Sequence, residues 1–561
     1  MKMKCLPAKP VFKIHPGRCA NTARKALITV AVSLLLLACG QSGGSSGNGT
    51  GTGTGTNAGT GTGGGSCYAA PSHQASSDGT TVLSGTVYYE DRTYDATGFT
   101  GVACLPVRNA TVDLMRNSVV ALTTTTDAAG AYSFAIPAAG TYYVRTLAQS
   151  GTVYNAVVKD NRDNSTYAVK SISLDIAAKD AWTVTLSAGM TGAGPAFNIY
   201  DNILKAQSVL QKYAPSATLP ALTAYWYDGK TTGTYYSNGA AGHTLDILGS
   251  PTDSDAYDDS VILHETGHYA AAVFSKDSSG GGAHSLTGHY DLRLTWSEGW
   301  ANFFSSLVKA EKAEPKPYVY VDTNGGTGTG SATLNFTFEI DTPSYASRAT
   351  GADNEVAVAN VLWTIYTAGA TPRLGLGFAD IWTNVTVGLK TDTYVTFEGF
   401  YDHWVATAGH PAGQLDPLLT ARSIKYAADA YETDSSAATA RAIVAGTSET
   451  HTFFGAGDTD WFKIAVTGGT AYTFATGALG DGCDTLMTLY NADGTTQLAQ
   501  NDDEISGKGS SKISWTADAT KTVYLKLEPY RPLISTDLAY STSTSWPPQI
   551  VKYGSYTLTV Q

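Results

Sequence analysis

Long hydrophobic runs are scarce in this 561-residue chain. The apolar run from Ala26 to Leu37 has about twelve residues, whereas a helix that crosses a bilayer needs about 20. We therefore do not expect this run to span a membrane. Its length is instead that of the central segment of a signal peptide.

Charged side chains are also few, at 15% of residues, and the 36 positive ones are outnumbered by 48 acidic ones. Residues 1–38 contain no acidic residue but seven positive ones: Lys2, Lys4, Lys9, Lys13, Arg18, Arg24 and Lys25. Removal of this segment lowers the formal net charge by seven, from −12 to −19. A surface this acidic disfavours nucleic acid as a partner.

The basic segment and the apolar run together predict a signal peptide over residues 1–38. It ends in Leu36-Leu37-Ala38-Cys39, which resembles the bacterial lipobox. The resemblance implies that Cys39 carries a lipid and that the chain is anchored outside the cytoplasm. In a Gram-negative cell it implies the outer membrane, because residue 40 is not Asp. The alternative is an ordinary signal peptide with an incidental cysteine.

Cysteine is scarce as well, with six residues in the chain. Two precede the predicted cleavage point and Cys39 takes the lipid, so Cys67, Cys104 and Cys483 remain. An odd number leaves at least one thiol unpaired within the chain. Cys67 and Cys104 are the candidate disulfide pair in an oxidising compartment, which the sequence alone does not establish.

The rest of the chain divides by composition into a tether and three domains. Residues 39–78 begin with a long Gly, Ser and Thr tract and predict a flexible tether. Residues 79–190 alternate apolar and polar residues between glycine turns, which predicts a β-sandwich. The motifs SGTVYYED, PVRNATVDLM and AGAYSFAIP resemble carboxypeptidase-regulatory-like, transthyretin-like modules, and the resemblance implies a structural or binding role.

Residues 433–561 again predict short strands. The stretches GDTDWFKIAV, TLMTLYNADGTTQLAQNDDE and GSYTLTV resemble the bacterial pre-peptidase C-terminal domain, a β-sandwich. That family often binds calcium at acidic turns, and the matching carboxylates are Asp458, Asp460, Asp484, Asp502 and Asp503. The alternative is that these acids are solvated turn residues.

Residues 191–432 differ, because helical periodicity appears there. Apolar spacings of three and four predict helices at 199–213, Val261–Phe274, Ser297–Leu307 and Glu355–Tyr366. Alternation at Thr244–Leu248 predicts a strand, which we expect to offer a sheet edge to an extended peptide. The expected fold is therefore multidomain, with an α+β domain flanked by two all-β sandwiches.

The predicted helix Val261–Phe274 contains the pattern H-E-x-x-H, formed by His264, Glu265 and His268. Positions four apart lie on one helical face, so both imidazoles can bind one metal ion. Glu265 points beside that ion and is suited to deprotonate a water molecule there. The alternative is a buried helix with two histidines that bind no metal.

A catalytic zinc ion needs a third protein ligand. Glu298, in the segment WSEGWAN thirty residues after His268, is the candidate. His284 and His289, in the preceding loop, are alternative ligands, but a loop histidine has no fixed aim. If neither histidine binds the metal, we expect them to line the substrate cleft or to face solvent.

H-E-x-x-H followed by a helix with S-E-G-x-A resembles the gluzincin metallopeptidases. Phe274 stands where a metzincin would carry its third histidine, which excludes that subclass. The gluzincin resemblance implies a zincin-like fold with Glu265 as the general base. It also implies a zinc ion whose ligands are His264, His268 and Glu298.

The same resemblance suggests two further roles. Asn302, four residues after Glu298, stands where thermolysin-like members have an aspartate that orients a ligand histidine. An asparagine is a weaker partner for that histidine than an aspartate. Gluzincins carry an oxyanion-stabilising donor downstream of the Glu ligand. Tyr401 and His403 are the candidates, with Tyr345 behind them. The alternative for all three is an aromatic core cluster.

The sequence thus predicts a zinc peptidase at the cell surface or in the periplasm, acting on a peptide or protein. One alternative is a surface binding or adhesion lipoprotein with an inert zincin-like core. Its weakness is that no residue of the H-E-x-x-H and Glu298 set has been lost, although one loss would suffice for decay. A further alternative is a zinc hydrolase with a non-peptide substrate.

Overall fold

The computed structural model describes residues 59–60, 67–95, 98–151, 154–326, 333–343, 347–370, 372–407, 409–411, 413–455, 457–505, 509–530 and 552–561. The predicted signal peptide, Cys39, most of the predicted tether and Tyr345 lie outside these residues. Among the described helices, none is both long and apolar enough to cross a membrane.

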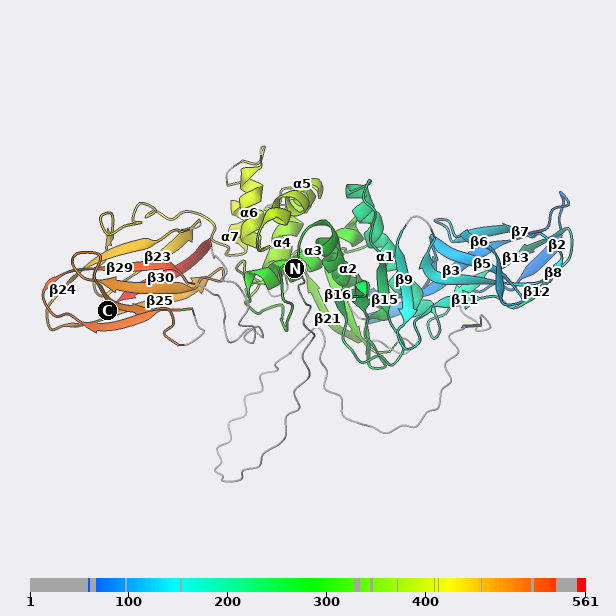
Figure 1. Ribbon diagram of the computed structural model, residues 1–561, viewed down its shortest axis with the longest axis horizontal. Coiled ribbons are helices and arrows are strands. Elements are labelled where there is room, and N and C mark those ends of the chain that lie inside the picture. Colours follow the sequence, from blue (N-terminus) through cyan, green and yellow to red (C-terminus); the bar gives the residue numbers. More distant parts are fainter. Residues whose placement is uncertain are drawn as a thin grey trace, which may run out of the picture. The chain divides into compact units, whose positions relative to one another are not determined.

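Strands make up the regular structure of the described residues up to Ala188 (Figure 1). They are β1 (Gly59–Thr60), β2 (Ser72–Ala75), β3 (Val82–Asp95), β4 (Gly98–Pro106), β5 (Ala110–Arg116), β6 (Val119–Thr125), β7 (Ala131–Ala135), β8 (Gly140–Ser150), β9 (Ala156–Asp160), β10 (Ser165–Thr166), β11 (Ala168–Lys170), β12 (Leu174–Ile176), β13 (Asp180–Thr183) and β14 (Leu186–Ala188). β2, β3, β4, β7, β13 and β14 form one sheet, and the others belong to a second. Since β1 and β2 fall within residues 39–78, the tether prediction is wrong for that part.

The second sheet continues beyond residue 190. It takes in β15 (Leu222–Tyr225), β16 (Tyr235–Gly239) and β17 (Gly242–Asp246). β9 pairs in parallel with β15, which pairs in parallel with β17, and β16 lies antiparallel at the end of the sheet. Buried apolar side chains on both sides of residue 190 also belong to one cluster. The predicted N-terminal sandwich is therefore not a separate unit, because it shares a sheet and a core with the region that follows.

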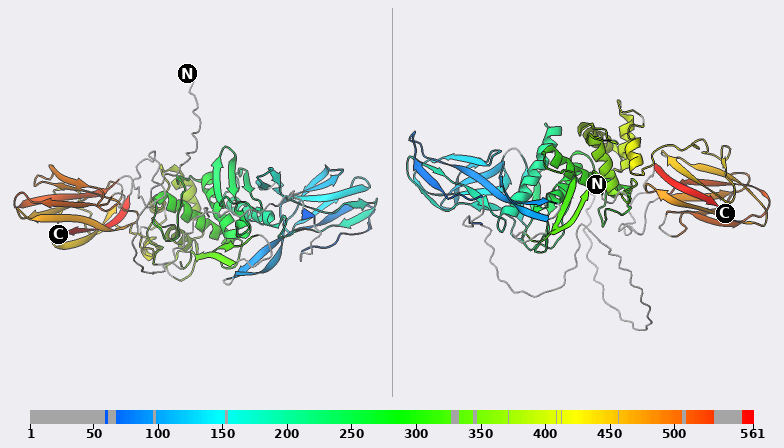
Figure 2. Two further views of the ribbon diagram at one scale, coloured as in Figure 1. Left: turned by 90° about the horizontal axis from the view of Figure 1, so that it is seen from below. Right: turned by 180° about the vertical axis from the view of Figure 1, so that it is seen from behind.

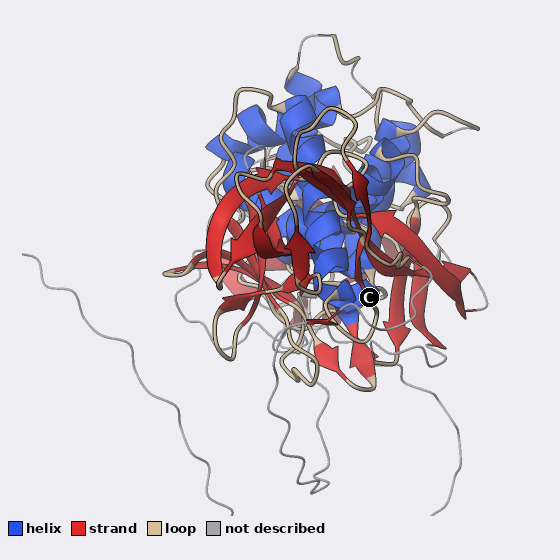
Figure 3. Cartoon of the chain, turned by 90° about the vertical axis from the view of Figure 1, so that its right-hand side faces the viewer, coloured by secondary structure: helices blue, strands red, loops and turns tan. Residues whose placement is uncertain are grey.

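The helices of the described residues lie in the middle of the chain and are drawn in blue in Figure 3. They are α1 (Gly194–Tyr213), α2 (Asp259–Phe274), α3 (Leu292–Glu311), α4 (Glu355–Tyr366), α5 (Ala379–Thr383), α6 (Phe397–Ala406) and α7 (Asp416–Ala421). Single turns, η1 (Asp255–Tyr257), η2 (Asn384–Gly388) and η3 (Leu389–Thr391), and short strands, β18 (Gly249–Ser250), β19 (Asp253–Ser254), β20 (Val319–Asn324) and β21 (Thr333–Glu339), complete this region. The four predicted helices correspond to α1–α4.

The C-terminal part of the chain forms a β-sandwich with its own core. Its strands are β22 (Arg441–Ala442), β23 (Thr447–Phe454), β24 (Asp460–Val466), β25 (Ala471–Gly480), β26 (Thr485–Tyr490), β27 (Gln497–Asn501), β28 (Lys512–Thr516), β29 (Lys521–Pro529) and β30 (Tyr553–Val560). One sheet has the order β22-β24-β29-β26-β27 and the other β23-β30-β25-β28. Phe462 and Leu525 from the first sheet join Phe474 and Leu558 from the second in one buried cluster.

The cysteines agree with the candidate pairing. Cys67 and Cys104 form a disulfide with a Cα–Cα distance of 5.6 Å. Cys483 is a buried free thiol in the C-terminal sandwich. The disulfide ties the segment just before β2 to β4.

Two glycines allow three helices to approach closely. A Cβ atom on Gly267 of α2 would lie 2.9 Å from Ala301 Cα of α3, and one on Gly299 of α3 would lie 2.7 Å from Val358 Cβ and 2.9 Å from the Glu355 carbonyl oxygen of α4. Real Cβ atoms do not come this near, so only glycine fits at both positions. α3 accordingly packs against both α2 and α4. The green helices of this region lie together near the centre of both views of Figure 2.

We predict that Gly299→Ala destabilises the protein by about 1–3 kcal/mol, because the added methyl group must push α4 away from α3. This effect should outweigh the roughly 1 kcal/mol by which alanine favours a helix over glycine. Urea unfolding measures the difference. Gly192→Ala is the control: this exposed turn residue has its nearest neighbour at 3.6 Å and should stay within about 0.5 kcal/mol. Equal or greater stability of Gly299→Ala would contradict the packing.

Candidate metal centre

Two helices bring the predicted ligands together. His264 and His268 lie one turn apart on α2, and Glu298 faces them from α3. Glu298 Oε2 is 3.0 Å from His264 Nε2 and 3.6 Å from His268 Nε2. The three ligand atoms all lie within 4.8 Å of one another. The structure thus gathers two imidazole nitrogens and one carboxylate oxygen at one point.

This donor set suits zinc. Ligands at about 2.0–2.1 Å from a tetrahedral zinc ion are separated by roughly 3.3 Å, and the two Nε2–Oε2 distances lie on either side of that value. The two imidazole planes are inclined by 79°, so their nitrogens approach one point from different directions. Nitrogen and oxygen donors from three residues leave a fourth position for water or substrate.

Each histidine is held by a second partner through its other ring nitrogen. His264 Nδ1 is 2.9 Å from Asn302 Oδ1, as expected for the residue four places after Glu298. His268 Nδ1 is 3.2 Å from Ser297 Oγ, which donates a 2.8 Å hydrogen bond to Asp277 Oδ2. Since these contacts occupy Nδ1, both Nε2 atoms are directed at Glu298, the arrangement typical of metal-binding histidines.

The electrostatics favour a cation. Burial by itself would raise the pKa of the Glu298 carboxyl, but His284, His268 and His264 hold that pKa well below its usual value. Burial would lower the pKa of His268, but Glu298 and Asp277 raise it well above its usual value. A buried carboxylate thus keeps its charge by attracting protons onto its neighbours, and a metal ion can replace those protons.

Glu265 lies beside these ligands in a cleft of about 720 Å³. Its carboxylate accepts a 2.7 Å hydrogen bond from the backbone N–H of Tyr236, in β16. β16 also lines the cleft and is the end strand of the sheet, whereas β17 is paired on both sides. The prediction that Thr244–Leu248 provides the free edge is therefore wrong, and the edge beside the cleft is β16.

The two loop histidines differ sharply. His284 lines the cleft with only 11% of its side chain exposed, and its Nε2 lies 3.6 Å from Glu298 Oε2. Its Nδ1 is 2.6 Å from Glu355 Oε2. Burial alone would lower the pKa of His284, but Glu298 and Glu355 raise it to about 10. His289 is half exposed and pairs with Asp353.

Tyr401 and His403 lie outside this cleft, which corrects their assignment as oxyanion-stabilising donors. The Tyr401 hydroxyl donates to the Tyr426 carbonyl oxygen at 3.1 Å, inside an aromatic cluster. His403 Nε2 is 2.8 Å from Asp392 Oδ1. Tyr401 therefore belongs to the buried core beside α6, whereas His403 is a partly exposed residue on the surface of that helix.

The five acids of the C-terminal sandwich divide into separate environments. Asp458 accepts the backbone N–H of Phe454, and buried Asp460 accepts the Tyr556 hydroxyl. The remaining acids, Asp484, Asp502 and Asp503, influence one another: burial raises the pKa of Asp484 to about 7, with added contributions from Asp503 and Asp502.

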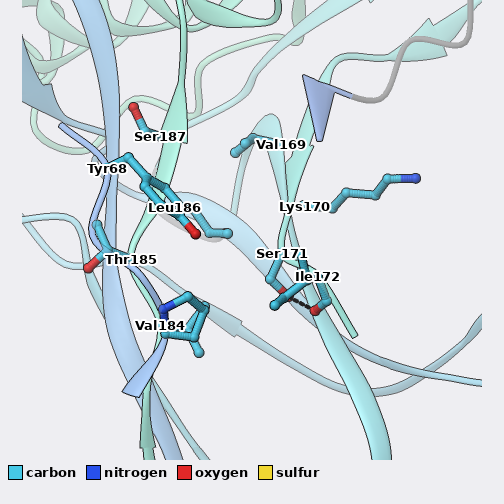
Figure 4. A pocket seen from close by; sticks show the side chains of 10 residues that line it. Tyr68, Val169, Lys170, Ser171, Ile172, Val184, Thr185, Leu186 and Ser187 are labelled. Carbon is cyan, nitrogen blue, oxygen red and sulfur yellow. Dashed lines mark hydrogen bonds between the residues drawn. The ribbon is translucent and has the colours of Figure 1, made fainter. Parts of the chain in front are cut away.

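Within the described residues, one other trio of metal-ligand atoms is equally close: Asp253, Asp255 and Asp322. It contains no histidine, and its Asp255 accepts a hydrogen bond from Thr234, which lines the cleft. Figure 4 shows a separate small hollow between Tyr68, Ile172 and Leu186. At about 10 Å³ it has room for one water molecule. We assign no function to either feature.

Comparison with known proteins relates the centre of the chain to one family. Residues 211–422 match the Mycolysin C-terminal domain, which occurs in metallopeptidase-associated proteins. The match spans α2, α3 and the whole metal-ligand trio. The chain is therefore related to peptidase-associated proteins. No curated protein matches the chain.

Solved structures give only weak likenesses. The pre-peptidase C-terminal domain of a Bacillus anthracis collagenase aligns at 15% identity over 22% of this chain and 94% of its own, with a TM-score of 0.16. The Aeromonas hydrophila lysozyme inhibitor PliG aligns at 12% identity over 22% of this chain and 100% of its own, with a TM-score of 0.14. TM-scores this low carry no structural argument.

We predict that Asn302→Ala lowers zinc affinity about 10- to 100-fold, because His264 Nδ1 loses the acceptor that orients the ring. Asn302→Asp should keep or raise the affinity, since a carboxylate is a stronger acceptor. Competition with a chromogenic chelator measures both. Asn360→Ala is the matched control: this buried asparagine bonds to the backbone carbonyls of Ile340 and Asp341, so its loss should leave zinc affinity unchanged. Equal affinities for Asn302→Ala and wild type would contradict the role of Asn302.

Proposed function

We propose that this chain is a zinc-dependent, gluzincin-like peptidase with a zincin-like catalytic domain. The observation that carries the proposal is the convergence of His264, His268 and Glu298, with Glu265 on the same cleft. The family match over residues 211–422 supports a peptidase-related role. An inert binding core would have no use for oriented second partners on both histidines.

Each of the four side chains has one task in the proposed reaction. His264, His268 and Glu298 hold the zinc ion, which when bound acts as a Lewis acid on water and on the scissile carbonyl. Glu265 accepts a proton from the attacking water and delivers it to the leaving amine nitrogen. The Tyr236 N–H fixes one oxygen of that carboxylate, which limits its rotation.

The cleft favours an extended peptide. β16 pairs on one side with β17 and forms the end of the sheet within the described chain. A substrate strand that pairs with β16 is carried past Glu265, because the backbone of Tyr236 contacts that carboxylate. We propose peptides or proteins as substrates, and no nucleic acid.

We propose that the protein works outside the cytoplasm, anchored by a lipid on Cys39 as its lipobox-like motif implies. The Cys67–Cys104 disulfide supports an oxidising compartment. The C-terminal sandwich is proposed to be a pre-peptidase C-terminal domain. Its Asp484, with Asp502 and Asp503, is the proposed calcium-binding group, since hard oxygen donors suit that ion.

We predict that Glu265→Gln retains one equivalent of zinc and loses about 10²–10⁴-fold in kcat on a peptide substrate, because an amide cannot accept the proton of water. Metal analysis and a fluorogenic peptide assay measure the two effects. Chelation should abolish wild-type activity, and added zinc should restore it.

Glu311→Gln is the matched control, since Glu311 pairs with Lys212 at the end of α3 and should leave activity unchanged. Hydrolysis by Glu265→Gln at the wild-type rate would refute the assignment of the base. A wild-type protein that binds zinc without cleaving any peptide would point to a non-peptide substrate, and one that binds no metal would point to an inert core.

A further inference from the structure

The cleft contains a fourth imidazole that the proposed reaction leaves without a task. His284 lies in the loop 275–291 between α2 and α3, yet only 11% of its side chain is exposed. It is not one of the three residues whose ligand atoms lie within 4.8 Å of one another. It lines the same cleft as Glu265 and Glu298. Its position is therefore beside the metal-binding point rather than on it.

The loop around His284 is fixed by the start of α4. The Asn354 side-chain amide donates 2.9 Å hydrogen bonds to the carbonyl oxygens of both Leu286 and Gly288. Tyr290 N–H donates to the Asp353 carbonyl oxygen at 2.8 Å. These bonds give this loop histidine the fixed aim that a loop by itself does not provide.

Glu355 sets the direction of the ring. It is buried in the first turn of α4, with 2% exposed, and its Oε2 lies 2.6 Å from His284 Nδ1. α4 can approach because Gly299 has no side chain. Carboxylates therefore face both ring nitrogens, Glu355 at Nδ1 and Glu298 at Nε2. Because Glu355 occupies Nδ1, Nε2 is the ring atom that points at the edge of the ligand trio.

Peptide hydrolysis needs a donor at this place. When water adds to the scissile carbonyl, a C–O bond forms and the carbonyl π electrons move onto oxygen, which becomes negative. Glu265 takes the proton from water and passes it to the amine nitrogen as the C–N bond breaks. A fixed N–H near the negative oxygen stabilises it without losing its proton.

We propose that His284 is the oxyanion-stabilising donor of this peptidase, with Glu355 as the residue that positions it. The inference rests on the proposed peptidase function. It gives the role first assigned to Tyr401 or His403 to a residue that lines the cleft. A positioning role for Glu355 also explains why this residue is buried against the loop 275–291, although it lies in the first turn of a helix.

The test compares His284→Ala, His284→Gln and Glu355→Gln in the full-length zinc-loaded protein. For His284→Ala we expect one equivalent of zinc with wild-type affinity, a fall of about 10²–10³-fold in kcat, and little change in KM. The inhibition constant of a phosphonamidate peptide, which mimics the tetrahedral state, should rise by the same factor as kcat/KM falls, while that of a product peptide should not change.

Two further variants separate catalysis from folding. His284→Gln should recover part of kcat, because its amide can still donate. Glu355→Gln should lower kcat less than His284→Ala, since it weakens the aim of the ring without removing it. His289→Ala is the matched control on the same loop: His289 also pairs with a carboxylate, that of Asp353, but is half exposed, and its loss should leave kcat unchanged.

Several outcomes overturn the inference. Loss of zinc in His284→Ala would make His284 a ligand instead of a donor. Wild-type kcat in His284→Ala, or an unchanged phosphonamidate inhibition constant, would leave it without a catalytic role. A wild-type protein that binds no zinc or cleaves no peptide overturns the proposed function itself, so the two failures are distinguishable.

Discussion

The contact between α2 and α3 at Gly267 and Ala301 determines where the two imidazoles meet the carboxylate. His264 and His268 sit on either side of that glycine, and Glu298 lies one turn before Ala301 on the facing helix. Glu298 Oε2 lies 3.0 and 3.6 Å from the two Nε2 atoms, so an outward shift of about 1 Å would move the carboxylate beyond the reach of a zinc ion held by both histidines. The whole site therefore requires glycine at position 267 of α2.

Around that contact, each functional group is held from a different element. Asn302 on α3 orients His264, while Ser297 and Asp277 orient His268. β16 fixes Glu265 from the sheet, and α4 fixes the loop that carries His284. The site therefore depends on the sheet that begins in the N-terminal half, since β16 and β17 extend it. This dependence gives the N-terminal strands a structural role in placing the cleft.

Regular periodicity made part of this arrangement predictable. A spacing of four on one helix suffices to place His264 beside His268, and the same spacing on the next helix places Asn302 against the metal-binding face. The partner of His284 was not predictable, because loop conformation leaves no periodic signal. Tyr401 and His403 had suitable chemistry and chain position, but nothing in the sequence indicates where α6 points. The shared sheet was missed because parallel pairing of β9 with β15 joins segments about sixty residues apart.

The most direct test is anomalous diffraction at the zinc edge from crystals of the zinc-loaded protein. The account predicts one strong peak about 2.0–2.2 Å from His264 Nε2, His268 Nε2 and a Glu298 oxygen, with His284 outside bonding distance. A peak among Asp253, Asp255 and Asp322 instead, or no peak between α2 and α3, would contradict it.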